Sequence, residues 1–551
     1  MTADRPAPGP LPGLRGALMV CGTNSDAGKS RVVTGLCRAL ARRGVRVAPF
    51  KAQNMALNSY VTRSGHEIGR AQGVQALAAG VEPEVDMNPI LLKPSSDRTS
   101  QVIVDGVPAG HLDAVAYHAA KPALRANVLS ALDRLRARFD VVLLEGAGSP
   151  AEINLLDGDL VNLWLADAAG IPAVVIGDID RGGVFASLYG TVALLPDHLR
   201  SCVKAFVINK FRGDPALLAP GLADLEARTG VPTIGVLPWV DGLHLDAEDS
   251  LALRRPWGSG DADAGPSDGN GDATGGILDA AVVRFPRISN FTDVDALGLE
   301  PSVGVRWVTR PAELGDPDLV ILPGTKATVA DLAWLRAQGL DAALAALPPS
   351  TTVLGICGGY QMLGRSIDDG VESGAGRVAG LGRLPVTTRF EATKVTRPRR
   401  GRALDRAVTG YQIHHGRTAS EAPWVDLDDE WGVDAEGATS ADGAVIGTSL
   451  HGLLESDAFR TAFLGAVATR RGRAFRPSGV SFGAAREAQF DRLADLVEAH
   501  LDMAAIEELL AAGVPADASG ERPARPAADR AARPTADRSR LAVPVPNPEY
   551  P

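Results

Sequence analysis

The chain is poor in cysteine, and the cysteines that it has are widely separated. The sequence contains 4 cysteines in 551 residues, and they occupy positions Cys21, Cys37, Cys202 and Cys357 without any C-x-x-C pair. Zinc sites and disulfide frameworks require clustered or regularly spaced cysteines. The spacing therefore argues against both and favours a reducing, cytoplasmic environment.

Long basic clusters and long apolar runs are also missing from the body of the chain. The formal net charge is −10, which argues against nucleic acid as the main partner and favours small molecules. No apolar run is long enough to span a bilayer. Residues 1–13 are rich in proline and glycine and show no basic segment followed by an apolar core, so no secretory signal is expected.

The length of the chain predicts more than one domain. A sequence of 551 residues, 45% of them hydrophobic, is too long for a single core. Residues 256–276 are acidic and glycine-rich, which predicts a flexible linker. We therefore expect domains at 14–255 and 277–511. Residues 512–551 are dominated by proline, alanine and arginine, which is typical of a disordered tail.

A glycine-rich turn near the N-terminus organises the first domain. The segment Gly22-Thr-Asn-Ser-Asp-Ala-Gly28-Lys29-Ser30 lies between an apolar run and a helix-like stretch. A strand, a glycine-rich turn and a helix start form a phosphate cradle, in which backbone N–H groups and the helix N-terminus attract the anion. Five residues separate Gly22 from Gly28, one more than in the usual P-loop. We predict nucleotide binding by this segment, with Thr23 and Asn24 in the turn.

Two later residues belong to the same predicted site. Lys51 follows the second apolar strand, 45–50, and ligands of open α/β sheets collect where the strands end. We expect Lys51 to contact a phosphate or a carboxylate. Glu145 ends the apolar strand 140–145; a carboxylate beside a P-loop is suited to hold Mg²⁺ together with Ser30. An N-cap or a surface ion pair is the alternative for Glu145.

Strands alternate with helices along the rest of both domains. In the first domain, 172–178, 205–212 and 233–238 are expected strands, and the stretch 65–80 is expected to be helical. The second domain repeats the alternation from residue 277. This order predicts a parallel, doubly wound α/β sheet in each domain.

A cysteine between glycines stands out in the second domain. In Thr352-Val-Leu-Gly355-Ile-Cys357-Gly-Gly-Tyr, a strand is expected to turn sharply into a helix. That geometry is typical of an exposed nucleophile elbow, and the helix N-terminus favours the thiolate. Gly358 is placed to offer a backbone N–H to an oxyanion, with Gly324 and Thr325 as candidates to complete that hole. A buried structural cysteine would not require glycines on both sides.

The order of motifs resembles one enzyme family. FKAQNMALNS (50–59), GHEIGRAQ (65–72) and DMNPILLKP (86–94) follow one another as in the cobyric acid synthase family. The second domain is similar to type I glutamine amidotransferases. The resemblance implies ATP- and glutamine-dependent amidation of the b, d, e and g carboxylates of adenosylcobyrinic acid a,c-diamide to give adenosylcobyric acid, and an N-terminal half similar to dethiobiotin synthetase.

Residue roles also follow from this resemblance. Asn209, in the strand end Asn-Lys-Phe-Arg, resembles the position that recognises the nucleotide base in related synthetases. His451 ends the strand 445–450 and corresponds to the base that serves the cysteine. Type I amidotransferases carry a glutamate two residues after the histidine, but here that residue is Leu453. Glu455 is the nearest carboxylate, and whether it completes a triad stays open. His414 and His415 compete for the role of base.

The two halves predict one chemistry in combination. A carboxylate does not react with ammonia at neutral pH, so the first half is expected to transfer the γ-phosphoryl of ATP to it and form an acyl phosphate. The second half is expected to release ammonia from glutamine through a thioester on Cys357. The alternatives are a cobyrinic acid a,c-diamide synthase, a related amidoligase, or a non-catalytic sensor that retained both folds. The oligomeric state and the corrin contacts stay open.

Overall fold

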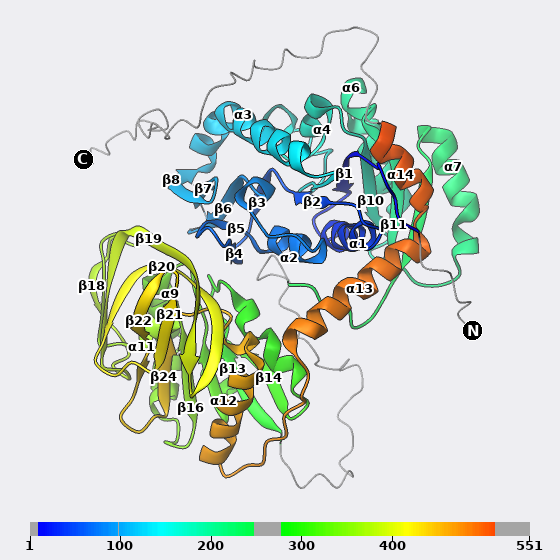
Figure 1. Ribbon diagram of the computed structural model, residues 1–551. Coiled ribbons are helices and arrows are strands. Elements are labelled where there is room, and N and C mark those ends of the chain that lie inside the picture. Colours follow the sequence, from blue (N-terminus) through cyan, green and yellow to red (C-terminus); the bar gives the residue numbers. More distant parts are fainter. Residues whose placement is uncertain (1–8, 97, 247–276, 513–551) are drawn as a thin grey trace. The chain divides into compact units, whose positions relative to one another are not determined.

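The computed structural model describes residues 9–96, 98–246 and 277–512 (Figure 1). The first half of the chain is built on a parallel sheet. Neighbouring strands are parallel throughout. Side chains of the central strands are buried on both faces, so helices must cover both. The strand order is β12 (Thr233–Pro238), β11 (Val203–Phe211), β10 (Ala173–Asp178), β1 (Gly16–Gly22), β9 (Val141–Glu145) and β2 (Val47–Phe50).

The alternating side chains of β1 separate two cores. Ala17, Met19 and Cys21 face a core built with α3, α4, α5 and α7. Leu18 and Val20 face a core built with α1 and with two helices from the end of the chain. The helices of this half are α1 (Lys29–Arg42), α2 (Arg70–Ala78), α3 (Ala114–Arg138), α4 (Leu163–Ala169), α5 (Val184–Leu194), α6 (Asp197–Arg200) and α7 (Ala219–Thr229), with short 3₁₀ turns η1 (Val85–Met87), η2 (Leu156–Gly158) and η3 (Pro215–Leu218).

Small sheets follow β2 in the segment that carries the family motifs. One contains β3 (Gln53–Met55), β6 (Ile90–Pro94), β7 (Thr99–Val104) and β8 (Val107–Asp113), and the other pairs β4 (Ser59–Val61) with β5 (Glu67–Gly69). The predicted helix over 65–80 is thus only partly correct. Its first residues pair with β4 as an antiparallel hairpin, and α2 begins at Arg70.

The second half contains another doubly wound sheet, which confirms the predicted fold class. Its strands are β14 (Val303–Val308), β13 (Leu278–Val283), β15 (Leu319–Leu322), β16 (Thr352–Ile356), β24 (Val445–Thr448) and β23 (Ala438–Thr439) in this order. The pairs are parallel except for the short edge strand β23.

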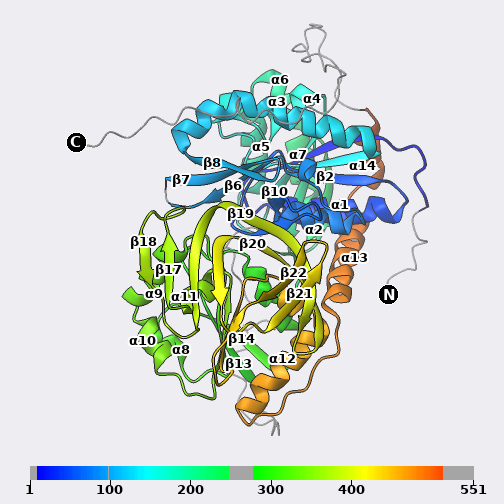
Figure 2. The same cartoon turned by 60° about the vertical axis from the view of Figure 1, so that its left-hand side comes forward.

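A largely antiparallel sheet, absent from the sequence analysis, accompanies it. Its central feature is the long hairpin of β19 (Val386–Ala403) and β20 (Arg406–Ser420), whose arrows stand out in yellow-green and yellow in Figure 2. The positive φ of Leu404 and Asp405 forms the tight turn between them. The other strands are β17 (Ser366–Asp369), β18 (Gly376–Ala379), β21 (Val425–Asp429) and β22 (Gly432–Glu436).

The helices of the second half include two that pack on the first sheet. α13 (Phe482–His500) lies along α1, and α14 (Met503–Ala512) reaches β1, where Leu510 packs in the core behind the P-loop strand. The described residues of both halves belong to one compact unit. The remaining helices are α8 (Pro311–Leu314), α9 (Thr328–Ala337), α10 (Leu340–Ala345), α11 (Gly358–Leu363) and α12 (Asp457–Arg470), with the 3₁₀ turns η5 (Phe291–Leu299) and η6 (Leu453–Glu455).

The predicted linker, 256–276, and the predicted tail beyond residue 512 lie outside the described residues. Among the helices that the structure describes, none combines the length and the apolar character required to cross a bilayer.

Candidate functional site

The glycine-rich turn connects β1 to α1, as the sequence predicted. Gly28 is the N-cap of α1 with φ of 103°, and a Cβ at this position would approach the Asn209 amide nitrogen to 2.1 Å. Glycine is therefore required both for the left-handed backbone and for the close approach of Asn209. The Asn209 amide donates to the Ala27 carbonyl at 2.8 Å and so ties the turn to β11.

Lys29 is folded back over the turn. Its ammonium donates to the carbonyl oxygens of Asn24 at 2.8 Å and Gly148 at 3.2 Å. The side chain is 4% exposed. The Thr23 N–H is already used by the Ile176 carbonyl at 2.9 Å, whereas the buried amide oxygen of Asn24 has no hydrogen-bond partner within the described residues.

Glu145 lies directly beside the start of α1. The Ser30 hydroxyl donates to its Oε1 at 2.9 Å, the Lys51 ammonium donates to the same oxygen at 3.0 Å, and the Gln75 amide donates to Oε2 at 2.5 Å. Burial raises the pKa of the carboxyl group, but Lys51 and the Gln75 hydrogen bond outweigh this and hold the pKa below its usual value. The surface-pair alternative for Glu145 is excluded, because the residue is 1% exposed.

The oxygens of Ser30 and Glu145 fit a magnesium site that is shared with phosphate. Mg²⁺ prefers oxygen ligands and commonly takes only one or two from the protein, with water and phosphate oxygens completing its shell. Within the described part of the chain, no group of three or more histidine, cysteine or carboxylate side chains forms an all-protein metal cage. The pair therefore suits a cation that arrives with a nucleotide.

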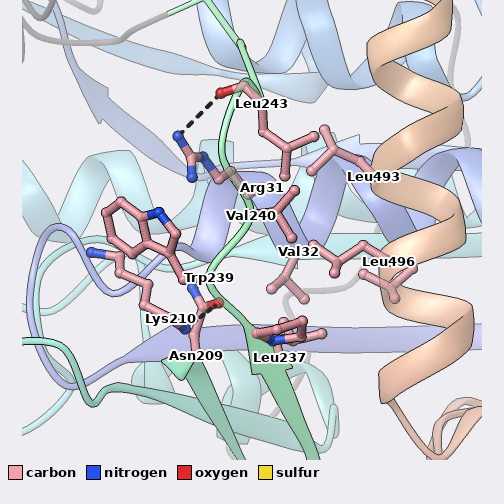
Figure 3. Close-up of a pocket in the computed structure, with 12 residues that line it drawn as sticks. Arg31, Val32, Asn209, Lys210, Leu237, Trp239, Val240, Leu243, Leu493 and Leu496 are labelled. Carbon is pink, nitrogen blue, oxygen red and sulfur yellow. Dashed lines mark hydrogen bonds between the residues drawn. The ribbon is translucent and has the colours of Figure 1, made fainter. Parts of the chain in front are cut away.

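A pocket opens beside the P-loop between β11, β12 and α13. Figure 3 shows Asn209 and Lys210 on one side and the apolar side chains of Leu493 and Leu496 from α13 opposite them. Arg31 also lines the pocket, and its guanidinium donates to the Leu243 carbonyl at 3.4 Å (Figure 3). Apolar walls with a few polar groups are the lining that small-molecule sites commonly have.

Helix α13 packs closely against α1. A Cβ on Gly35 would lie 2.7 Å from the Leu493 carbonyl oxygen, so the two helix backbones are in close contact. Outside this contact, Arg38 pairs with Asp491 at 2.7 Å and Arg42 pairs with Asp495 at 2.6 Å. A helix that follows the cysteine domain in sequence therefore forms one wall of the pocket in the first half.

Cys357 occupies the sharp turn between β16 and α11. Its φ of 49° with ψ of −106° lies outside the regions that residues with a side chain usually adopt. The flanking glycines allow close packing: a Cβ on Gly358 would meet the Thr325 side chain at 2.6 Å, and one on Gly359 would meet the Leu322 carbonyl at 1.9 Å. The sharp turn from strand to helix is present as expected. The expected exposure is wrong: Cys357 is only 7% exposed, because β20 covers it, with the Ile413 carbonyl 4.0 Å from Sγ.

His451 meets the cysteine and a carboxylate that the sequence analysis missed. Its Nδ1 lies 2.7 Å from Asp293 Oδ2, and it is close enough to Cys357 for the charge of that residue to act on its pKa. The other Asp293 oxygen accepts from the Gly452 N–H at 2.7 Å. Burial lowers the pKa of His451, but the charges of Asp293 and Cys357 outweigh it and raise this pKa to about 10. The arrangement favours an imidazolium beside the sulfur.

Glu455 does not orient His451. Its carboxylate lies instead 3.3 Å from the Arg70 guanidinium and 3.5 Å from that of Arg486. The third member of the cluster is Asp293, which precedes His451 by 158 residues. The only sequence signal was an aspartate in a polar turn, Asn290-Phe-Thr-Asp293, and such turns are common.

His414 and His415 do not form a comparable relay. Each imidazole bonds a backbone carbonyl through Nδ1, His414 at 2.7 Å to Gly416 and His415 at 3.0 Å to Glu391. Burial lowers the pKa of both, to about 3 for His414, which keeps them neutral at physiological pH. These hydrogen bonds favour a structural role for the pair over a role as base.

The family models divide the chain at the same place as the two sheets. Residues 18–252 match the CobQ/CobB/MinD/ParA nucleotide binding domain, and residues 279–459 match the CobB/CobQ-like glutamine amidotransferase domain. Together with the P-loop and the cysteine elbow, these matches define a nucleotide-binding domain fused to a glutamine amidotransferase domain. The chain is therefore a glutamine-dependent amidoligase by class.

Relatives identify the family more closely. The chain is 54% identical to a cobyric acid synthase from Frankia casuarinae and to another from Nocardia farcinica, in each case over 91% of this chain and 98% of the relative. A cobyric acid synthase from Streptomyces coelicolor is 51% identical with the same coverage. The chain belongs to the cobyric acid synthase family.

Proposed function

We propose that this chain uses ATP and glutamine to amidate the b, d, e and g carboxylates of adenosylcobyrinic acid a,c-diamide, giving adenosylcobyric acid. The single observation that supports this best is the presence, in one chain of this family, of a P-loop with a buried carboxylate and of a strained cysteine paired with His451. The first arrangement suits phosphoryl transfer, and the second suits amide hydrolysis.

In the first half, the residues of the turn bind and orient the nucleotide. The N–H groups at the start of α1 and the Lys29 ammonium hold the β- and γ-phosphates, so that Lys29 leaves its backbone carbonyl partners when phosphate enters. Ser30 and Glu145 would hold Mg²⁺, which would supply neutralisation of phosphate charge. The substrate carboxylate attacks the γ-phosphorus, ADP leaves, and an acyl phosphate results.

In the second half, Cys357 and His451 release ammonia. The thiolate attacks the side-chain carbonyl of glutamine, and the Gly358 N–H stabilises the oxyanion. Imidazolium His451 protonates the amide nitrogen, so that the C–N bond breaks, ammonia leaves and the thioester remains. Water then hydrolyses the thioester and yields glutamate. Ammonia attacks the acyl carbon of the acyl phosphate, inorganic phosphate leaves, and loss of a proton from the nitrogen gives the amide.

One experiment tests the whole proposal. Purified protein is incubated with the corrin diamide, ATP and glutamine labelled with ¹⁵N in its side-chain amide, and the corrin is examined by mass spectrometry. The expected product contains four labelled amide nitrogens. Consumption of ATP and glutamine without nitrogen transfer to the corrin would refute the proposal.

A further inference from the structure

The loop after β2 contacts the segment that carries Asp293. The Asn58 side-chain oxygen accepts a hydrogen bond from the Phe291 N–H at 3.2 Å, and the Ser59 N–H donates to the side-chain oxygen of Asn290 at 3.0 Å. Asn58 and Ser59 are completely buried. Hydrogen bonds at such a buried site are costly to lose, because the groups left behind find no water.

The contacted segment is the one that positions His451. Asn290 has φ of 51° and immediately precedes η5, so its backbone sets the direction of the turn. Its amide nitrogen lies 3.5 Å from His451 Nε2, and Asp293, three residues further on, holds Nδ1 at 2.7 Å. Both nitrogens of the imidazole therefore face residues of this one turn.

The loop itself is anchored in the first half. The Ser59 hydroxyl donates to Glu67 at 2.6 Å and accepts from the Lys93 ammonium at 2.9 Å, and the Asn58 carbonyl accepts from the Arg70 N–H at 3.3 Å. The same loop begins at Lys51, which bonds Glu145 beside the P-loop. One short stretch of chain thus contacts the carboxylate of the nucleotide site and the turn of the thiol site.

We infer that Asn58 is a positioning residue for glutamine hydrolysis: with Ser59 it holds the Asn290–Asp293 turn so that Asp293 meets His451, and the glutaminase depends on the loop of the synthetase half. The inference rests on the proposed function of Cys357 and His451. It makes the loop a structural element of both reactions, although Asn58 itself touches neither glutamine nor the sulfur.

The test substitutes Asn58 by alanine in the full-length protein. We expect kcat for glutamine hydrolysis to fall by about 10- to 100-fold with KM for glutamine within about twofold, because the turn shifts while the substrate pocket persists. Amidation driven by high ammonium is expected to stay within about threefold of wild type. The alkaline limb of the pH profile of kcat is expected at lower pH, because a displaced Asp293 no longer raises the pKa of His451 as strongly. The other groups that face the imidazole are Asn290, Cys357 and the stacked ring of Tyr411.

A second variant and a matched control keep the test decisive if Asn58→Ala folds poorly. Asn290→Gly tolerates the positive φ and removes the acceptor of the Ser59 N–H, so it should give the same loss. Glu455→Gln removes the charge from a different contact of the same halves, that with Arg70, and should leave glutamine hydrolysis within about twofold. Thermal unfolding of each variant shows that it is folded.

Three results would overturn the inference. Unchanged glutamine hydrolysis in folded Asn58→Ala and Asn290→Gly would do so, as would an equal loss in Glu455→Gln. Loss of ammonium-driven amidation in Asn58→Ala, with glutamine hydrolysis intact, would assign Asn58 to binding of the acid substrate instead. Failure of the proposed function is visible separately, because wild type and Cys357→Ala would then hydrolyse glutamine equally.

Discussion

The two candidate sites are assembled in different ways. The nucleotide site is built around one continuous turn, 22–30, which Glu145 joins from the neighbouring strand β9. The thiol site combines Cys357, His451 and Asp293 from three separated segments, and Asn58 supports it from the other half. Local sequence therefore specifies the centre of the first site, while packing specifies the second. Each site can therefore be broken separately.

Cys357→Ala should separate the two sites most clearly. Glutamine-dependent amidation is expected to fall by more than about 1,000-fold, because the thioester no longer forms, while high ammonium still supports amidation. The measurement is amide formation with each nitrogen donor. Loss of both activities in a folded protein would show that the cysteine has another role.

Lys29→Ala should show the reverse pattern. Amidation with either donor is expected to fall by about 100- to 1,000-fold, because the cation that stabilises the transferred phosphoryl group is removed. Glutamine hydrolysis without ATP serves as the control and should persist. Full amidation activity would remove the assignment of Lys29 to phosphate.

Asp293→Asn tests the part of the thiol site that the sequence did not reveal. Glutamine hydrolysis is expected to fall by about 100-fold, with ammonium-driven amidation retained. The pKa of His451, raised to about 10 in the native protein, should fall once the carboxylate charge is gone, so activity should be lost at lower pH than in wild type. A pH profile of kcat measures this shift, and an unchanged alkaline limb would contradict it.

The same pair predicts a pH effect on stability. The pKa of His451 is above its ordinary value, so the stabilisation from its pair with Asp293 is complete below the unfolded pKa and is lost as pH rises through about 10. Wild type should therefore lose more stability than Asp293→Asn between neutral pH and pH 10 in denaturant titrations. Equal losses would show that the pair contributes nothing.

Leu496→Asp addresses the pocket wall that α13 contributes. A carboxylate opposite Asn209 should raise KM for ATP by about three- to tenfold, because an apolar wall becomes charged, and should leave glutamine hydrolysis unchanged. Asp495→Asn is the matched control, since Asp495 lies on the neighbouring outer face with Arg42. An unchanged KM for ATP in Leu496→Asp would exclude the pocket as the nucleotide site.

The amino-acid sequence by itself determined the local units. Alternating strands and helices predicted two doubly wound sheets, and the glycines around Lys29 and Cys357 predicted two sharp turns, because positive φ and close backbone contact are properties of a few adjacent residues. It did not predict the β19–β20 hairpin or the hairpin that begins the 65–80 segment. Those depend on pairing with distant strands, and local propensity does not report such pairing.

Only the tertiary structure decided which side chains meet. It brought Asp293 rather than Glu455 to His451, covered Cys357 with β20, and placed α13 beside the pocket of the first half. A carboxylate 158 residues from its histidine partner leaves no trace in sequence spacing. The physical reason is that such contacts arise from the burial and hydrogen bonding of segments that the fold, and not their order along the chain, brings together.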